Sequence, residues 1–227
     1  MRKTRIDTEE NMKFLDSPGL LIIISSPSGA GKSSLASELV RTDKNLSFSI
    51  SFTTRKKRPG ELEGKDYFFT DVAHFKSLIK GEQMLEYAKV FDNFYGTPMA
   101  PVEKALNFGK DIVFDVDWQG GDQIRASKFS PNVVSIFILP PSISELETRL
   151  LSRRQDTKEI VFNRMSEAKS EIENWIKYDY VLINEKFSDT LGDIRVIIQS
   201  KRLELCRNPE LRNFIGVLNN EFNERKY

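Results

Sequence analysis

The sequence predicts an α/β fold in which helices cover a parallel β-sheet, and three observations support this. The segment Leu20–Ile24 is a continuous run of apolar residues, typical of a strand that is buried on both faces. Further largely apolar runs recur at 112–114, 133–139 and 180–183. Apolar residues at helical spacing lie between and after these runs, and strands that alternate with helices indicate a parallel sheet.

The elements of this sheet can be followed along the chain. A turn rich in Ser, Pro and Gly follows the first strand, and Leu35, Ala36, Leu39 and Val40 then repeat at the spacing of a helix. The last strand is followed by a second helical pattern, made by Leu191, Ile194, Ile197, Ile198 and Leu205. Beyond about residue 187 the chain reads as amphipathic helix, which either packs back on the core or mediates self-association.

The region between about 49 and 100 has a different pattern. Phe48, Ile50 and Phe52 alternate with serines, and 67–69 and 84–91 are further short strands. Asp71–Lys80 is predicted to be a short helix that ends at Gly81. This mixture of short elements predicts an inserted α+β module rather than a continuation of the parallel sheet.

The chain is therefore expected to have four parts. Residues 1–18 are polar and are predicted to be a mobile N-terminal tail. A capping box, Ser142 with Glu145, opens a helix that leads into an arginine-rich stretch, and the family resemblance of the motifs below implies that this stretch is a helical lid. The predicted division is a core of 19–48, 101–141 and 174–227 (with the C-terminal extension), a module of 49–100 and a lid of 142–173.

Composition excludes several classes of protein. The chain has 227 residues, enough for one core with inserted subdomains, and 34 basic against 33 acidic residues give a net charge of +1. This balance does not favour nucleic acid or an anionic membrane as a partner. A single cysteine and a single histidine exclude an intramolecular disulfide and a four-ligand Cys/His zinc site. With no apolar run long enough for a bilayer and no secretory signal, a cytoplasmic protein is expected.

The strongest motif lies between the first strand and the first helix. It matches the phosphate-loop pattern, in which glycines let backbone N–H groups converge on phosphate oxygens at a helix N-terminus. Lys32 provides a mobile cation for the β- and γ-phosphates, and the Ser33 hydroxyl is suited to ligate Mg²⁺. The first glycine of the usual pattern is Ser26 here. The predicted ATP-binding residues are Ser26, Pro27, Ser28, Gly29, Ala30, Gly31, Lys32, Ser33 and Ser34.

This motif predicts a core of the P-loop NTPase type and a nucleotide ligand. Asp115 follows the strand at 112–114, where a second acidic residue often meets the metal in phosphate-loop enzymes. Asp117 lies two residues further on, so in a strand both side chains would project from one face. A phosphate loop alone leaves an ATPase, a GTPase and a small-molecule kinase open.

Further motifs narrow this choice. In chain order they are Ser51–Gly60 (with Thr53-Thr54-Arg55 and Arg58-Pro59-Gly60), Gly64–Tyr67, Glu86-Tyr87, Tyr95-Gly96-Thr97 and Asp115–Gly120. Together they resemble the guanylate kinase family over about residues 19–185. The resemblance implies transfer of the γ-phosphoryl group of Mg·ATP to GMP, giving ADP and GDP, in purine nucleotide metabolism and GMP salvage. It implies ATP and GMP as ligands, with dGMP as a further candidate, and leaves monomer or homo-oligomer undecided.

The residues of the inserted module have chemistry that suits GMP. Arg55 and Arg58 carry guanidinium groups that can clamp a phosphate bidentately. The Glu86 carboxylate only accepts hydrogen bonds, which suits the N1–H and 2-amino donors of guanine and rejects adenine. The resemblance adds Ser51, Tyr67 and Tyr95 around the phosphate of GMP, and Thr97 and Asp117 around its base. Asp115 is assigned, with Ser33, to the Mg²⁺ site, with capping of the next helix as the alternative.

The lid supplies the remaining candidates. The resemblance matches Arg153 and Arg164 to arginines that close over the ATP phosphates, so the predicted catalytic set is Lys32, Arg58, Arg153 and Arg164. Arg154 departs from the small or polar residue common at its position and is interpreted as solvated. Arg149 is expected to pair with Glu145 on the helix surface.

Two other functions stay open at this point. A kinase for another nucleoside monophosphate would be favoured if Glu86 did not face the base. A guanylate-kinase-like module that only holds a protein partner is the second alternative, although such modules commonly lose the loop lysine or the lid arginines, which are present here. Turnover of different monophosphates distinguishes the first alternative, and ATP binding distinguishes the second.

Overall fold

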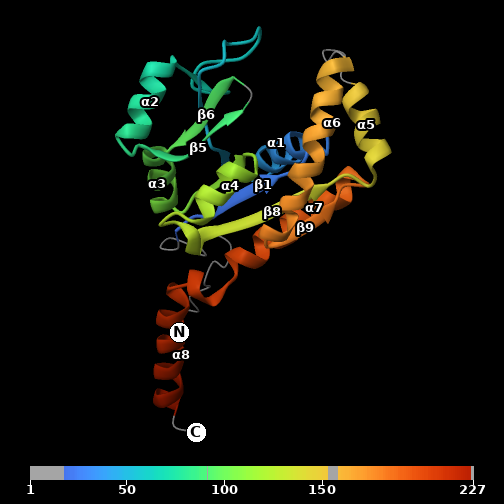
Figure 1. The fold of residues 1–227 in the computed structure, drawn as a ribbon. Helices are drawn as coiled ribbons and strands as arrows, with labels where there is room; N and C mark the ends of the chain where they lie inside the picture. The colour runs from blue at the N-terminus through green and yellow to red at the C-terminus, as the bar shows by residue number, and fades with distance from the viewer. Residues whose placement is uncertain (1–17, 91, 153–157, 226–227) are drawn as a thin grey trace.

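The computed structural model describes residues 18–90, 92–152 and 158–225, and its centre is a five-stranded sheet. The strands are β1 (Leu21–Ser25), β2 (Leu46–Phe48), β7 (Asp111–Asp115), β8 (Val133–Leu139) and β9 (Tyr180–Ile183). They lie in the order β2-β7-β1-β8-β9, and every neighbouring pair is parallel. The predicted α/β fold with a parallel sheet is confirmed (Figure 1).

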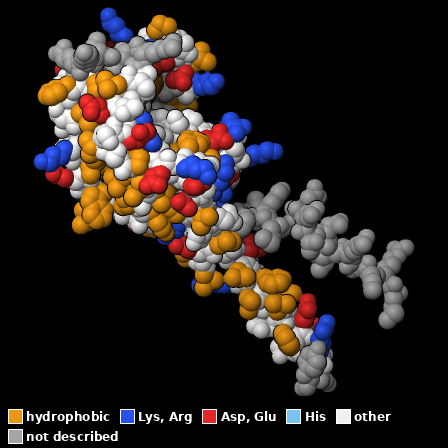
Figure 2. All heavy atoms as spheres, turned by 90° about the vertical axis from the view of Figure 1, so that its right-hand side faces the viewer, with side chains coloured by type: hydrophobic (Ala, Val, Ile, Leu, Met, Phe, Trp, Pro, Cys, Tyr) orange, Lys and Arg blue, Asp and Glu red, His pale blue; other side chains and the backbone are white. Residues whose placement is uncertain are grey.

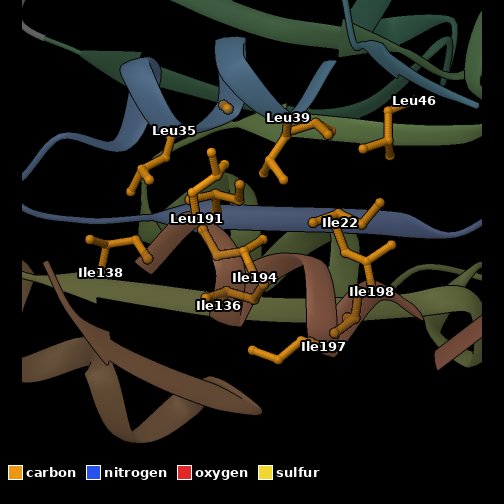
Figure 3. Close-up of a cluster of buried hydrophobic side chains, with 14 of the residues drawn as sticks. Ile22, Leu35, Leu39, Leu46, Ile136, Ile138, Leu191, Ile194, Ile197 and Ile198 are labelled. Carbon is orange, nitrogen blue, oxygen red and sulfur yellow. The ribbon is translucent and has the colours of Figure 1, made fainter. Parts of the chain in front are cut away.

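Helices cover both faces of this sheet because its central strand is apolar on both sides. All five residues of β1 are buried. Ile22 and Ile24 pack with α1 (Lys32–Thr42) and α7 (Phe187–Arg202) on one face, where Figure 3 shows Leu35, Leu39 and Ile194 around the strand. The alternate side chains of β1 face a second cluster that includes α3 (Met99–Asn107) and α4 (Trp118–Arg125). This packing holds the end of β1, and the loop after it, rigidly in place.

The inserted module forms a second, smaller sheet. Its strands are β3 (Phe52–Thr53), β4 (Phe68–Phe69), β5 (Met84–Val90) and β6 (Asn93–Pro98), in the order β4-β3-β6-β5. The helix α2 (Val72–Lys80) begins after Asp71, whose side chain accepts a hydrogen bond from the His74 N–H, and ends before Gly81, as predicted. The predicted alternating segment of Phe48, Ile50 and Phe52 is divided: Phe48 ends β2 of the core sheet, and Phe52 begins β3 of the module.

The lid candidate is a pair of helices, α5 (Ile143–Leu151) and α6 (Lys158–Ile172), that stand beside one another on the opposite side from α2 (Figure 1). Leu146 and Leu150 of α5 pack against Val161 and Ala168 of α6. The Ser142 side chain accepts from the Glu145 N–H at 3.1 Å, which confirms the predicted helix start. Short 3₁₀ turns at Ser130–Asn132, Glu173–Lys177 and Leu205–Arg207 complete the connections.

The C-terminal helix α8 (Glu210–Arg225) projects away from the body of the molecule (Figures 1 and 2). Of the two alternatives for this extension, packing back on the core is observed for α7, through Leu191, Ile194 and Ile198, but not for α8, which contributes no buried residue. Leu205 was expected on the preceding helix but lies in a 3₁₀ turn, because α7 ends at Arg202. Residues 1–17 of the predicted tail lie outside the described residues, and within the described ranges no helix has the length and apolar character needed to cross a membrane.

Candidate active site

The phosphate-loop candidate connects β1 to α1 as a tight turn. Gly29 and Gly31 have φ angles of 98° and 100°, the left-handed region that favours glycine, whereas Ser26 does not. Asn184, at the end of β9, donates its side-chain N–H to the Ala30 carbonyl at 2.8 Å, and a Cβ on Gly31 would come within 2.5 Å of that side-chain nitrogen. The serine at the first position therefore leaves the turn intact, because the demanding backbone angles fall on the two glycines.

Lys32 and Ser33 open α1 and meet Asp115 at the end of β7. The parallel pairing sets Asp115 opposite Ile24, so its carboxylate lies beside the loop. Lys32 forms an ion pair with one carboxylate oxygen, and the Ser33 hydroxyl donates to the other at 2.7 Å. Burial raises the pKa of Asp115, but the charge of Lys32 and the hydrogen bonds from Lys32 and Ser33 outweigh it and hold the pKa below its ordinary value. A hydroxyl and an ionised carboxylate are oxygen ligands of the kind Mg²⁺ prefers, so this pair fits the predicted metal site.

Two cavities meet at these residues. The larger, about 590 Å³, lies between the core sheet and the inserted module. The smaller, about 220 Å³, follows the phosphate loop. Lys32, Ser33 and Asp117 line both. The larger cavity also brings together the predicted residues Ser51, Tyr67, Glu86, Tyr95 and Asp115.

Glu86 lies on β5 with its side chain facing the larger cavity. Only 4% of the residue is exposed, and the Thr97 hydroxyl donates to Oε1 at 2.7 Å. Oε2 lies against bare backbone of α4, since a Cβ on Gly120 would approach it to 2.8 Å. Burial raises the pKa of Glu86 to about 7, the charge of Asp117 adds to this, and the hydrogen bond from Thr97 opposes it. The site therefore holds a buried carboxyl whose protonation changes near neutral pH.

Asp117 is placed by a helix and not by a strand. Because β7 ends at Asp115, the expectation that both aspartates project from one face of a strand is wrong. Asp117 is the N-cap of α4 and accepts from the Gly120 N–H at 2.9 Å. The capping role considered for Asp115 thus belongs to Asp117, and both still line the larger cavity.

The arginine pair of the module is organised by a residue that the sequence patterns did not single out. Arg55 forms a bidentate ion pair with Glu61, at 2.7 and 3.0 Å, which lowers the pKa of Glu61 to about 2. The Glu61 carboxylate also accepts from the Arg58 N–H at 2.7 Å. The Arg55 guanidinium lies over the Tyr67 ring, 5.3 Å from its centroid. Arg58 itself is exposed and does not line either cavity, so its predicted role stays a prediction.

Of the hydroxyls predicted around GMP, those of Tyr95 and Thr97 lie on β6, and those of Ser51 and Tyr67 directly precede β3 and β4. Ser51 Oγ is 3.2 Å from Thr97 Oγ1, which links a residue predicted for the phosphate to one predicted for the base. The rings of Tyr67 and Tyr95 meet edge-on with centroids 6.0 Å apart. Burial raises the pKa of Tyr67, so its hydroxyl keeps its proton and can donate to an anion.

Of the four lid arginines, Arg149 and Arg164 lie within the described residues. Arg153 and Arg154 lie outside the described residues, and Arg164 lies on α6. Arg149 pairs with Glu145 at 2.9 Å as expected, and also donates to the Asn184 carbonyl at 3.2 Å.

Glu171 on α6 is a second residue that sequence reasoning missed. Its carboxylate accepts from the Ser28 N–H of the phosphate loop at 3.2 Å and lines the smaller cavity. Burial raises its pKa, and the Ser28 hydrogen bond opposes that shift. No local signal marks this glutamate, because 143 positions separate it from Ser28.

The central strand of the parallel sheet ends in a phosphate loop, and the loop adjoins a second cavity lined by lysine, hydroxyl and carboxylate groups. This arrangement defines a nucleotide-binding phosphotransferase of the P-loop class. The sequence model of the family described as guanylate kinase matches residues 19–201. The chain belongs to the guanylate kinase family, and the resemblance found from its motifs is confirmed.

Individual relatives agree with this assignment. The guanylate kinase of Cereibacter sphaeroides is 51% identical over 207 residues, covering 91% of this chain and 98% of the relative. That of Jannaschia sp. is also 51% identical, covering 94% and 98%. The crystal structure of guanylate kinase from Anaplasma phagocytophilum is similar with a TM-score of 0.72 and 36% identity, over 88% of this chain and 95% of that one.

Proposed function

We propose how the residues of the two cavities carry out the activity of the guanylate kinase family. That activity is transfer of the γ-phosphoryl group of ATP to GMP, with formation of ADP and GDP. The observation that supports these roles is the meeting of two cavities at Lys32, Ser33 and Asp117. A donor in one cavity and an acceptor in the other would have their phosphates adjacent. Such an enzyme acts in purine nucleotide metabolism, where it returns GMP to the diphosphate level.

On the donor side, the loop 26–34 holds the phosphates of ATP. Its backbone N–H groups and the N-terminus of α1 supply positive partial charge, and Lys32 supplies a full charge that can follow the moving phosphoryl group. Ser33 and Asp115 are the residues that would hold Mg²⁺, which when bound neutralises charge on the phosphates. Binding of ATP has to separate Lys32 from Asp115 in part, because the two are paired here.

On the acceptor side, the larger cavity holds GMP with its base toward Glu86 and Asp117. The ionised Glu86 carboxylate accepts from N1–H and the 2-amino group of guanine, and Thr97 keeps that carboxylate in place. Adenine has an acceptor at N1 and would leave the buried charge unpaired. The phosphate of GMP is assigned to Arg55, Arg58, Ser51, Tyr67 and Tyr95, with Glu61 orienting Arg55.

The transfer needs no protein nucleophile or strong base, because the attacking atom is already a phosphate oxygen. That oxygen forms a bond to the γ-phosphorus while the bond from the γ-phosphorus to the β–γ bridging oxygen breaks, and the electron pair leaves with ADP. Lys32, Arg58, Arg153 and Arg164 are proposed to offset the charge of the group in transit. Closure of the lid and the module over both substrates would exclude water and limit ATP hydrolysis.

A coupled assay of ADP release tests this function. With Mg·ATP, the chain is expected to turn over GMP and to leave AMP, CMP and dTMP almost unused. Similar rates with another monophosphate would favour the alternative kinase, and GMP binding without turnover would favour the binding-module alternative. A cytoplasmic location, and the absence of nucleic-acid and membrane partners, stay predictions.

The pKa of Glu86 predicts a pH dependence of GMP binding. Only the ionised carboxylate accepts from both guanine donors, so with a pKa of about 7 the affinity falls as pH falls through that value. Between pH 8 and pH 6 the ionised fraction falls about tenfold, and the Kd for GMP measured by calorimetry is expected to rise by about that factor. The Glu86→Gln variant has no titrating carboxyl at this position. The pH dependence of its Kd for GMP therefore measures the titration of the GMP phosphate itself near pH 6. An equal pH dependence in both proteins would contradict the prediction.

Gly120→Ala is expected to impair GMP binding without unfolding the protein. The added Cβ would meet Glu86 Oε2 at 2.8 Å and Val116 Cβ at 3.2 Å. The end of the glutamate side chain can move away, and Val116 has to shift only slightly, so the cost to stability is small. The movement displaces the carboxylate from the base, so KM for GMP should rise about tenfold, as expected for one lost hydrogen bond to a charged group. Steady-state kinetics with a thermal melt checks this. Gly192→Ala on α7, where a Cβ would contact nothing within 4 Å, is the control. A large drop in melting temperature would instead indicate a packing defect.

A further inference from the structure

The inserted module is joined to the core along the outer edge of β5. This strand is at the end of the order β4-β3-β6-β5, so one side of its backbone has no strand beside it. The helix α4 lies against that side and presents Gln123 to it. The Gln123 side chain accepts from the Tyr87 N–H at 3.1 Å and donates to the Tyr87 carbonyl at 2.7 Å. Its amide therefore satisfies both backbone groups that a neighbouring strand would otherwise satisfy.

This pairing lies next to the residue that faces the base. Glu86 precedes Tyr87, and the pairing of β5 with β6 is irregular between Met84 and Glu86. At such an irregularity the regular ladder alone does not fix the direction of the side chain. Glu86 is held instead by Thr97 at Oε1 and by the close backbone of Gly120 at Oε2.

The N-cap and two residues of α4 lie next to Glu86 or to the residue that follows it. Asp117 caps the start of the helix and raises the pKa of Glu86 through its charge, Gly120 contacts Oε2, and Gln123 holds the backbone of the next residue. Gln123 also donates weakly to the Gln119 carbonyl at 3.3 Å, which aligns its amide along the helix. The distance between Glu86, on the module, and Asp117, on the core, therefore depends on how α4 is attached to β5.

We propose that Gln123 is a positioning residue for base recognition, which fixes Glu86 relative to Asp117 by pairing with both backbone groups of Tyr87. The inference rests on the proposed function, since it assigns Gln123 to the selectivity of the GMP cavity. Without this side chain, Tyr87 would pair with water, β5 would gain freedom at its edge, and the carboxylate would no longer meet both donors of guanine.

The test is Gln123→Met, which keeps the length of the side chain and removes both hydrogen bonds. KM for GMP is expected to rise about tenfold, in the range expected for two neutral hydrogen bonds, while kcat and KM for ATP stay within about twofold. The preference for GMP over IMP, which lacks the 2-amino group, should narrow by a similar factor. Gln123→Glu, which replaces the donor to the Tyr87 carbonyl by a repelling oxygen, is expected to act in the same direction and serves if the Met variant does not fold. Gln199→Met, exposed on α7, is the matched control.

Each outcome decides the matter. Unchanged KM for GMP and an unchanged GMP-to-IMP ratio in a folded Gln123 variant, beside an active unmodified chain, would overturn the positioning role and leave the proposed function standing. An equal loss of kcat/KM with GMP and with IMP, together with a lower melting temperature, would show that Gln123 has a merely structural role. That result would also overturn the positioning role. Failure of the unmodified chain to turn over GMP would contradict the proposed function itself.

Discussion

Glu86→Gln is expected to lower kcat/KM for GMP by about 10²- to 10³-fold and to leave KM for ATP unchanged. The substitution replaces an acceptor-only group by an amide, whose N–H₂ then faces a guanine donor inside a buried site. Hydrogen bonds to charged groups contribute about 1.5–3 kcal/mol each, and two are affected. Coupled kinetics with GMP and ATP varied in turn separates the two effects.

The control for this variant is Glu210→Gln, an exposed glutamate on α8 far from both cavities. It is expected to behave like the unmodified chain. If Glu86→Gln kept kcat/KM for GMP within about threefold, while Glu210→Gln also had no effect, the base would have to be recognised by other residues. The alternative of a kinase for another monophosphate would then gain support.

Lys32→Met is expected to lower kcat by about 10³-fold with little effect on the Kd for GMP. Among the described residues that line the smaller cavity, this lysine is the only side-chain cation. An electrostatic group directed at a transferring phosphoryl typically contributes several kcal/mol to the transition state. Removing it also leaves Asp115 without its cation, so a carboxylate would face the ATP phosphates uncompensated. Pre-steady-state turnover and GMP titration together test this expectation.

Lys76→Met, on the exposed face of α2, provides the matched control and should retain full activity. A Lys32 variant that retained more than about a tenth of kcat would place the catalytic cation elsewhere, and the arginines of the lid would be the next residues to test.

The sheet and the phosphate loop were predictable because each depends on local pattern. Strands buried on both faces must be apolar throughout, and the runs at 112–114 and 133–139 appear as β7 and β8. The strand β6 and the helix α3 were not predicted. Asn93–Pro98 carries little apolar periodicity, and α3 has Pro101 in its first turn, where proline is tolerated but obscures the helical signal.

The residues of the candidate site likewise fall into those that local motifs predicted and those that they did not. Glu86, Thr97 and Asp117 were predicted from motifs, and the structure brings them together around one cavity wall. Gln123 and Glu171 were missed because each acts through a contact made by the fold: Gln123 is 36 positions from Tyr87, and Glu171 is 143 positions from Ser28. Glu61 was also missed, although its partners are close in the sequence. Glu61 alone had a local signal, a carboxylate three residues after Arg58 in a turn of the chain.

The orientation of the C-terminal helix also could not be obtained from its sequence. Its apolar residues, among them Phe214, Ile215 and Phe222, predicted an amphipathic helix, and α8 is helical. These side chains stay largely exposed because the helix extends away from the core (Figure 2). Periodicity indicates that a helix has an apolar face, but it carries no information on what that face contacts.

Transfer of labelled phosphate from [γ-³²P]ATP tests the central claim most directly, because ADP release alone would also result from hydrolysis. With Mg²⁺, GMP and the unmodified chain, the label is expected in GDP, in an amount equal to the ADP formed, and AMP in place of GMP should give almost no labelled ADP. Label found only in inorganic phosphate, or label in neither product while ATP is bound, would contradict direct transfer between the two cavities.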